Sequence, residues 1–264
     1  MTTRCVRQVL GSVLAAAWVV LGAGCGLQLS LNAEAHDQWK KSYKLAQGGS
    51  FEVHNTNGRM EIRTGDTDAV EVVADRTVRA GSDEAAKDAL SRMEIGETVS
   101  PDHILLDTTA KGMNVQVNIS KKVDFVVTLP RWAVVNLVST NGDIEVTDLT
   151  GALTIDTTNG RVRATGLGTA AKVESTNGAI TLEFDKVADP GITCETTNGA
   201  IQVTIPANSK ATISARVSNG TIVTKGLDLS ATEQSRRRLD ASLGGGGPSI
   251  RLSTTNGLVE LRGR

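Results

Sequence analysis

The sequence is poor in aromatic residues and in cysteine. Phe, Trp and Tyr make up 3% of its 264 residues, so a folded core must be built from aliphatic side chains. Its three cysteines are Cys5, Cys25 and Cys194, of which the first two lie in the N-terminal leader described below. We therefore expect no intramolecular disulfide bond. Cys194 falls on an apolar strand position and is expected to be a small buried hydrophobic residue rather than a nucleophile.

The chain also lacks a charge imbalance and the motifs of common catalytic sites. Its 28 basic and 29 acidic residues leave a net charge of −1, which argues against nucleic acid as a partner. His36, His54 and His103 are scattered, and we find neither a Cys/His metal spacing nor a Ser-His-Asp arrangement. The glycine run 244–247 lacks the Lys-Ser/Thr of a phosphate-binding loop and is expected to be a flexible joint. These absences predict that the protein is not an enzyme.

The N-terminal residues have the features of an export signal. Arg4 and Arg7 precede an apolar run, Val9–Leu21, which is short for a membrane span. The following segment, 21–25, resembles a bacterial lipobox, which implies a lipoprotein with the lipid attached to Cys25. Two alternatives stay open: ordinary signal cleavage after Ala35, giving a secreted or periplasmic protein, and an uncleaved span that ends near residue 31. We assign residues 1–35 to the signal peptide and linker.

A short unit repeats along the folded part of the chain. Asn-Gly, each time preceded by Thr or Ser, begins at Asn57, Asn141, Asn159, Asn177, Asn198, Asn219 and Asn256. From Asn141 onward the separations are 18, 18, 21, 21 and 37 residues. A period of about 20 residues is typical of stacked repeat architectures.

Alignment of the units on their Asn shows two apolar columns. Four residues before the Asn stand Val53, Leu137, Ile155, Val173, Cys194, Ala215 and Leu252. Three residues after it stand Met60, Ile144, Val162, Ile180, Ile201, Ile222 and Val259. The intervening residues are mostly polar, which predicts two half-buried strands on either side of a turn.

Two all-β folds satisfy this pattern. Asn-Gly suits a two-residue hairpin, which would give an antiparallel hairpin meander. It also suits the corner of a parallel β-solenoid, in which equivalent residues of successive coils stack on one another. We favour the β-solenoid, because only stacking explains why the same residues recur in every unit.

The repeat divides the chain into a regular and an irregular part. Residues 133–264 carry the regular repeat, except for a projecting loop expected at 227–248. Residues 36–132 are less regular and contain a short helix near residues 82–93, with Ser82 as its N-cap, covering one end of the core. In this part we predict strands at Phe51–Val53, Met60–Arg63, Val70–Ala74, Ile104–Asp107, Val115–Ile119 and Phe125–Leu129. We treat both parts as one continuous domain.

The strand Val123–Pro130, the serial T-x-N-G units, and the closing G-G-G-P-S-I-R-L-S-T-T-N-G resemble a bacterial family with β-strand repeats, a domain of unknown function named "putative adhesin". The resemblance runs from Phe51 to the end of the sequence. It implies an exported or membrane-anchored protein of the cell envelope and favours a β-helical fold. The resemblance implies no catalytic residues.

One outward column is the candidate binding site. Three residues before the Asn lie Asp156, Glu174 and Glu195, followed by Arg216 in the next unit, so a solenoid would stack three carboxylates on one face. Such a column could bind a sugar or Ca²⁺, although solvated strand charges are the simpler interpretation. On the other strand of the unit we expect two structural ion pairs, Asp143–Arg161 and Glu145–Arg163. The threonine column before each Asn and a ladder of the Asn side chains inside the corner are expected to serve stability.

These observations predict a non-enzymatic envelope protein, an adhesin or surface scaffolding module whose partner is an envelope polysaccharide or a surface protein. A β-helical enzyme acting on polysaccharides and an envelope-stress sensing or signalling partner are the alternatives. Clustering of the three carboxylates in a groove with basic residues would favour the enzyme, and a flat, open face would favour binding.

Overall fold

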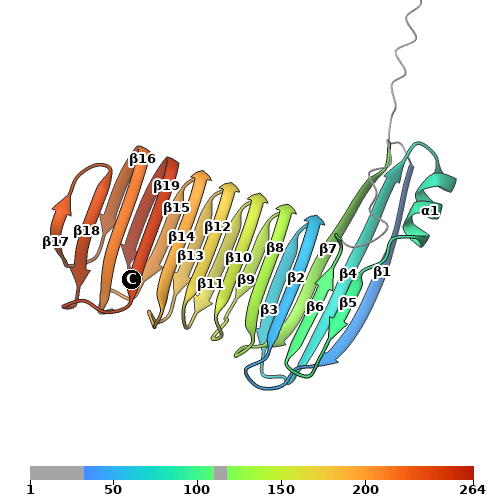
Figure 1. Ribbon diagram of the computed structural model, residues 1–264, viewed down its shortest axis with the longest axis horizontal. Coiled ribbons are helices and arrows are strands. Elements are labelled where there is room, and N and C mark those ends of the chain that lie inside the picture. The colour runs from blue at the N-terminus through green and yellow to red at the C-terminus, as the bar shows by residue number, and fades with distance from the viewer. Residues whose placement is uncertain (1–32, 110–117) are drawn as a thin grey trace, which may run out of the picture.

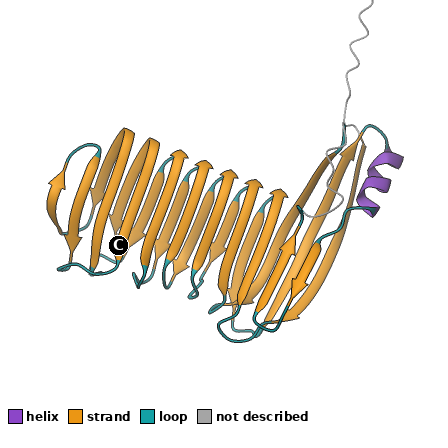
Figure 2. Ribbon diagram, in the orientation of Figure 1, coloured by secondary structure: helices purple, strands orange, loops and turns teal. Residues whose placement is uncertain are grey.

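The computed structural model describes residues 33–109 and 118–264, which form a long stack of strands with one helix at one end (Figures 1 and 2). The predicted leader up to residue 32, including Cys25, and most of the strand predicted at 115–119 lie outside the described residues. Strand β1 begins at Ala33, so residues 33–35, which we had assigned to the linker, belong to the fold.

The repeat units pair in parallel and in register. Ile155 lies opposite Leu137 on one side and Val173 on the other, and Asn159 lies opposite Asn141 and Asn177. This pairing confirms the parallel β-solenoid and excludes the antiparallel meander for these units. Each coil contributes one strand before its Asn-Gly corner and one strand after it.

The coils therefore form two layers. The first layer holds the strands before each corner: β2 (Ser50–Asn57), β8 (Val134–Asn141), β10 (Leu153–Asn159), β12 (Ala171–Asn177) and β14 (Gly191–Asn198). The second layer holds the strands after it: β3 (Met60–Gly65), β9 (Ile144–Thr147), β11 (Val162–Leu167), β13 (Ile180–Phe184) and β15 (Ile201–Ile205). Two strands, β16 (Ala211–Lys225) and β19 (Ser249–Gly263), run through the corner and contribute to both layers.

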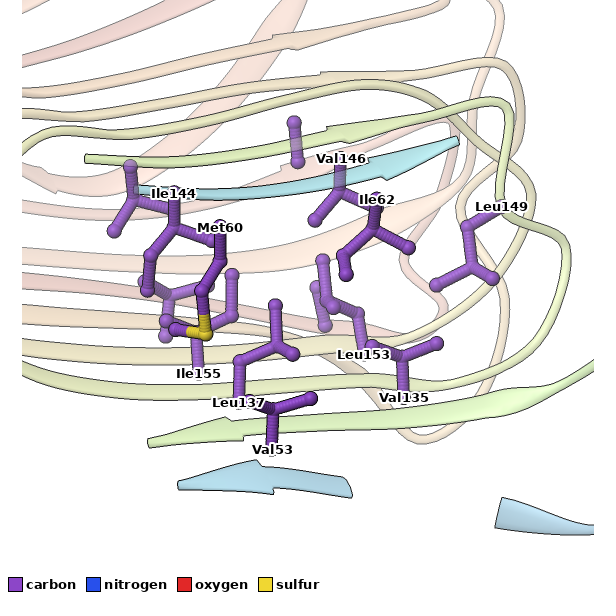
Figure 3. Close-up of a cluster of buried hydrophobic side chains, with 14 of the residues drawn as sticks. Val53, Met60, Ile62, Val135, Leu137, Ile144, Val146, Leu149, Leu153 and Ile155 are labelled. Carbon is purple, nitrogen blue, oxygen red and sulfur yellow. The ribbon is translucent and has the colours of Figure 1, made fainter. Parts of the chain in front are cut away.

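The core lies between the two layers. Met60, Ile62 and Val146 point toward Val53 and Leu137 across the interior (Figure 3). Both predicted apolar columns are at most 1% exposed, except for Ile222 in the coil of β16, which is partly exposed. Cys194 is fully buried in this core, and burial raises the pKa of its thiol, as expected of a hydrophobic rather than a reactive cysteine.

The corners of neighbouring coils pack so closely that they leave no room for a Cβ atom, so only glycine fits there. At Gly160, φ is +140°, and a Cβ atom would lie 2.1 Å from the carbonyl oxygen of Gly142 in the neighbouring coil. At Gly199 the corresponding distance to the oxygen of Gly178 is 2.0 Å. Backbone hydrogen bonds join the same corners, for example from the Gly160 N–H to the carbonyl oxygen of Asn177. The stacking distance between coils therefore requires glycine at this position of the corner.

The asparagines form one continuous amide ladder beside these glycines. The spatial order is Asn57, Asn141, Asn159, Asn177, Asn198, Asn256 and Asn219. From Asn141 onward each Nδ2 donates to the Oδ1 of the preceding Asn in this order, at 2.8–3.0 Å. The Nδ2 of Asn57 donates to the carbonyl oxygen of Lys121. The predicted ladder is confirmed, but most of its members are exposed rather than inside the corner. The residues two positions before the Asn are the ones that point inward. Among them, the Thr196 and Thr254 hydroxyls donate to the carbonyl oxygens of Gly178 and Gly199.

At the N-terminal end of the stack, one more parallel strand in each layer is followed by antiparallel strands. In the second layer, β3 is followed by β7 (Ser120–Pro130), β4 (Ala69–Ala80) and β1 (Ala33–Lys44); in the first, β2 is followed by β6 (His103–Asp107) and β5 (Gly96–Val99). Helix α1 (Asp83–Ser91) packs on β1 and β4, and the Ser82 hydroxyl caps it by accepting from the Ala85 N–H. The predicted helical end cover is confirmed. In the described part of the chain, no helix is long and apolar enough to cross a membrane.

The other end differs from the prediction in two ways. Residues 227–248 are not a projecting loop, because β17 (Leu229–Gln234) and β18 (Arg238–Leu243) form a hairpin that pairs antiparallel with β16 and extends the first layer. In addition, the last coil in the sequence is not the last in space. Strand β19 lies between β14/β15 on one side and β16 on the other, so the C-terminus is found within the stack (Figure 1).

Replacement of a corner glycine tests the stacking constraint. We expect Gly160→Ala to lower the free energy of unfolding by about 2 to 5 kcal/mol, because it adds both an overlap with Gly142 and an unfavourable φ. The matched control is Gly81→Ala, where a Cβ atom meets nothing within 4 Å. Urea unfolding of the three proteins measures the difference, and equal midpoints would contradict the close packing of the corners.

Candidate functional site

The three predicted carboxylates lie side by side on the outer face of the first layer. Asp156 on β10 is the register partner of Glu174 on β12, which in turn is the partner of Glu195 on β14. Neighbouring strands are about 4.8 Å apart, so the carboxylates form a column along the stack. We call these three residues the acid column.

The acid column borders a shallow hollow of about 320 Å³. Exposed threonines from the residue before each Asn, Thr176, Thr197 and Thr255, line its other side, so the threonine column faces solvent beside the acids. Lys172 donates from Nζ to Glu174 Oε1 at 2.8 Å, and this hydrogen bond raises the pKa of Lys172, with smaller contributions from the charges of Glu195 and Asp156. The hollow is therefore rich in hydrogen-bond acceptors, and Lys172, which is not part of its lining, pairs with one of its three carboxylates.

The acid column does not have the arrangement of a calcium site. Ca²⁺ takes six to eight oxygen ligands from side chains that converge on one point, whereas these carboxylates project side by side from successive strands. Among residues 33–109 and 118–264, no group of three or more His, Cys, Asp or Glu side chains is placed to hold a metal ion. The residues therefore do not fit the cation that we considered from the sequence.

Arg216 does not lie next to Glu195, although the order of the units in the sequence predicts that it does. Because β19 lies between β14 and β16, Ser253 is the neighbour of Glu195, and Arg216 is one strand further along. Arg216 Nη2 donates to both carboxylate oxygens of Asp240 on β18, at 2.8 Å each. Its structural role is thus to attach the hairpin to the last coil.

Two of the three histidines, which we described as scattered, meet around one carboxylate at the other end of the same face. Glu52 Oε1 lies 2.6 Å from His54 Nε2, and Glu52 Oε2 lies 3.8 Å from His103 Nε2. The Ser50 hydroxyl lies 2.8 Å from His103 Nδ1. This group does not have the hydrogen bonds of a catalytic triad, because the distance of 3.8 Å between His103 and Glu52 exceeds that of a hydrogen bond.

The parallel pairing of β2 with β6 creates this histidine cluster. The alternation of Ser50, Glu52 and His54 on β2 already indicated three side chains on one face of a strand. The approach of His103 could not be read from the sequence, because the irregular part of the chain shows no repeat from which to derive the register.

On the outer face of the second layer, one of the two predicted ion pairs is confirmed. Arg161 Nη2 lies 3.1 Å from Asp143 Oδ2, and the Arg161 backbone N–H donates to Asp143 Oδ1 at 2.9 Å. That backbone hydrogen bond is the main reason why the pKa of Asp143 is lowered. The second predicted pair is wrong, because Glu145 is paired with Arg59 instead of Arg163.

The contact between Arg216 and Asp240 predicts acid-sensitive stability. Arg216 lowers the pKa of Asp240 below its ordinary value of 3.8, so the unfolded chain takes up this proton at a higher pH than the folded chain does. The stabilisation is complete well above pH 3.8 and is lost as the pH falls through the lower folded value. We therefore expect the stability difference between wild type and Asp240→Asn to shrink as the pH is lowered from 6 to about 2.5.

Urea unfolding over this pH range measures the effect. The matched control is Asp228→Asn, because Asp228 belongs to the same segment and has no ion pair within the described residues. A difference between wild type and Asp240→Asn that stays constant with pH would contradict the assignment.

Solved structures with a similar arrangement of strands are distant in sequence. One is a "putative cell adhesion protein" from Clostridium sporogenes ATCC 15579, with 11% identity over 86% of this chain and 100% of the other, and a TM-score of 0.44. Another is a "putative adhesin" from Bacteroides fragilis NCTC 9343, with 14% identity over 86% of this chain and 97% of the other, and a TM-score of 0.44. No curated protein is significantly similar in sequence to this chain.

The sequence of the chain matches the model of one protein family over most of its length. The family described as Toastrack DUF4097 matches residues 28–262, which span the strands from β1 to β19 except for the last residue of β19. The match covers the described residues except for the last two, and the chain belongs to the Toastrack DUF4097 family.

Proposed function

We propose that this protein is a non-enzymatic binding or scaffolding module of the bacterial cell envelope, and that it acts in adhesion or surface assembly. The observation that carries the proposal is the outer face of the first layer, where side chains of one kind recur at the spacing of one strand. A rigid surface of this kind offers the same contacts repeatedly along its length. It therefore suits a partner that is itself extended and repetitive.

The chemistry of this face favours a polysaccharide over a surface protein. Carboxylates and threonine hydroxyls line the hollow beside the acid column, and they form hydrogen bonds with sugar hydroxyl groups. Protein interfaces usually contain a cluster of aromatic or other large apolar residues at their centre. On this face, among the described residues, Val138 is the large hydrophobic side chain that is clearly exposed.

Glycan-array binding tests this proposal. We expect Glu174→Ala and Glu195→Ala each to weaken polysaccharide binding by about tenfold, because each removes a charged hydrogen-bond acceptor. Binding is expected to be the same with and without calcium. The matched control is Asp228→Ala, an exposed carboxylate outside the hollow. Identical profiles for wild type and both acid-column variants would remove the acid column from the proposal.

A polysaccharide-acting enzyme is the second candidate, and the position of Lys172 among the carboxylates is the observation that favours it. A glycosidase needs two carboxyl groups on opposite sides of the scissile bond. The acid column instead places its carboxylates side by side on an open face, which favours binding. Release of reducing ends from a bound polysaccharide, abolished by Glu174→Ala, would establish the enzyme.

We further propose that the protein is a lipoprotein anchored through Cys25. The fold supports this position over cleavage after Ala35, because Ala33 and Ala35 are buried and pair with Ala80 and Val78 of β4. Cleavage after Ala35 would remove the first three residues of β1. Processing at Cys25 would keep β1 whole and leave residues 26–32 as a short tether to the membrane.

Mass spectrometry of the mature N-terminus tests the anchor. We expect a chain that begins at Cys25 and carries acyl groups, and we expect Cys25→Ser to abolish the modification and release the protein from the membrane fraction. A mature chain that begins at His36 would contradict the proposal.

A further inference from the structure

A second hollow, of about 470 Å³, lies on the outer face of the second layer. Its charged lining residues are Arg59, Asp143, Glu145, Arg161 and Arg163. Because this layer lies on the other side of the core, the hollow is separate from the acid column. We call it the arginine hollow.

The arginine hollow forms because the coil of β11 carries long side chains at positions where the next coils carry short ones. At the position two residues after the Asn, Arg161 is followed in the next coils by Ala179 and Ala200. At the position four residues after the Asn, Arg163 on β11 has Thr181 on β13 as its register partner. The two arginines thus border a strip of small, uncharged side chains that continues along the layer.

The arginines of the hollow differ in how they are paired. Arg161 is held by Asp143, and Arg59 contacts both Glu61 and Glu145. Glu145 forms its ion pair with Arg59. The Arg163 guanidinium therefore has no hydrogen bond or ion pair to any residue in the described ranges. Arg163 is exposed, so its donors face the solvent at the edge of the hollow.

An unpaired guanidinium beside a second arginine is suited to bind an oxyanion. A guanidinium presents parallel N–H groups that match the two oxygens of a carboxylate or sulfate. The lining carries three arginines against two carboxylates, so its local charge is positive although the protein as a whole is at −1. The charges of Asp143 and Glu145 would repel a densely charged polymer such as nucleic acid or an anionic membrane. They would tolerate a ligand with separate negative groups among neutral ones.

We infer that the arginine hollow binds an acidic polysaccharide, with one carboxylate or sulfate group on Arg163 and Arg161 and the neighbouring sugar units along the strip of Ala179 and Thr181. The arginine hollow is thus a second site, on the layer opposite the acid column, and its ligand is of a defined chemical class. Binding there does not depend on the acid column, because the two hollows share no residue.

Isothermal titration calorimetry with defined oligosaccharides tests the inference. The probes are an oligogalacturonate, which carries carboxylates, a sulfated oligosaccharide of similar length, and a neutral oligosaccharide. We expect wild type to bind at least one of the two anionic probes and to bind the neutral one at least tenfold more weakly. Arg163→Gln should weaken binding of the anionic probe about tenfold. Arg163→Lys should restore part of the affinity, because it keeps the charge but not the planar fork.

Two control variants separate this site from the rest of the protein. Arg251→Gln removes an exposed arginine of the first layer that also has no ion pair within the described ranges, and it should change the affinity less than twofold. Glu174→Gln should leave binding of the anionic probes unchanged even if it abolishes binding at the acid column. The failure of one site can thus be told from the failure of the other.

Three results would overturn the inference. The first is that wild type binds neither anionic oligosaccharide at millimolar concentration. The second is that Arg163→Gln and Arg251→Gln weaken binding equally, which would indicate a general effect of charge. The third is that a single-stranded DNA oligomer binds more tightly than either oligosaccharide with the same dependence on Arg163.

Discussion

The distance between stacked corners is the constraint on which the rest of the structure depends. Neighbouring coils approach until a glycine carbonyl oxygen occupies the space of a Cβ atom, about 2 Å from its ideal position in the next coil. At this distance the corner N–H groups reach the carbonyl oxygens of the next coil, and the Asn amides reach one another. Because the corners fix the register, the strand positions beside each corner also meet their equivalents, and the register between β11 and β13 shifts only after Ala164. The apolar columns, the amide ladder and the acid column all follow from this one alignment.

A stack held in this way must be closed at both ends, and the chain does so by changing from parallel to antiparallel pairing. Strands β4 and β1 with helix α1 cover one end, and the β17–β18 hairpin extends the other. The outer strand β17 is polar and exposed, which discourages further pairing with other chains. Among the described strands, β19 is the one that pairs with β16 on its inner side and with β14 on the other, so Asn198 meets Asn256 across 58 residues of chain. Closure of so long a loop has an entropic cost, which the hydrogen bonds along both edges of β19 offset.

Much of the fold could be predicted from the repeat, because the same spacing recurs and strand alternation is a local property. The buried columns, the register of Asp156, Glu174 and Glu195, and helix α1 follow from such patterns. The errors arise where chain order and spatial order differ. The order of the units in the sequence predicts Arg216 beside Glu195, although β19 lies between their strands. The basic run 236–238 and the glycine run 244–247 interrupt the repeat and predict a loop, although β17 and β18 form there. Glu145 had arginines on both neighbouring coils, and only side-chain conformation decides between Arg59 and Arg163.

The two outer faces can differ in function because the core does not depend on them. The same coils present carboxylates and threonines on the first layer and arginines paired with acids on the second. Packed sheets lie about 10 Å apart, and side chains on the outer faces are further apart still. The Debye length at physiological ionic strength is about 8 Å, so the charges of one face are largely screened from the other. A net charge near zero therefore conceals two local fields of opposite sign. Exposed positions of this solenoid can change without disturbing the corners, and a difference in ligand between the two layers needs no change in the fold.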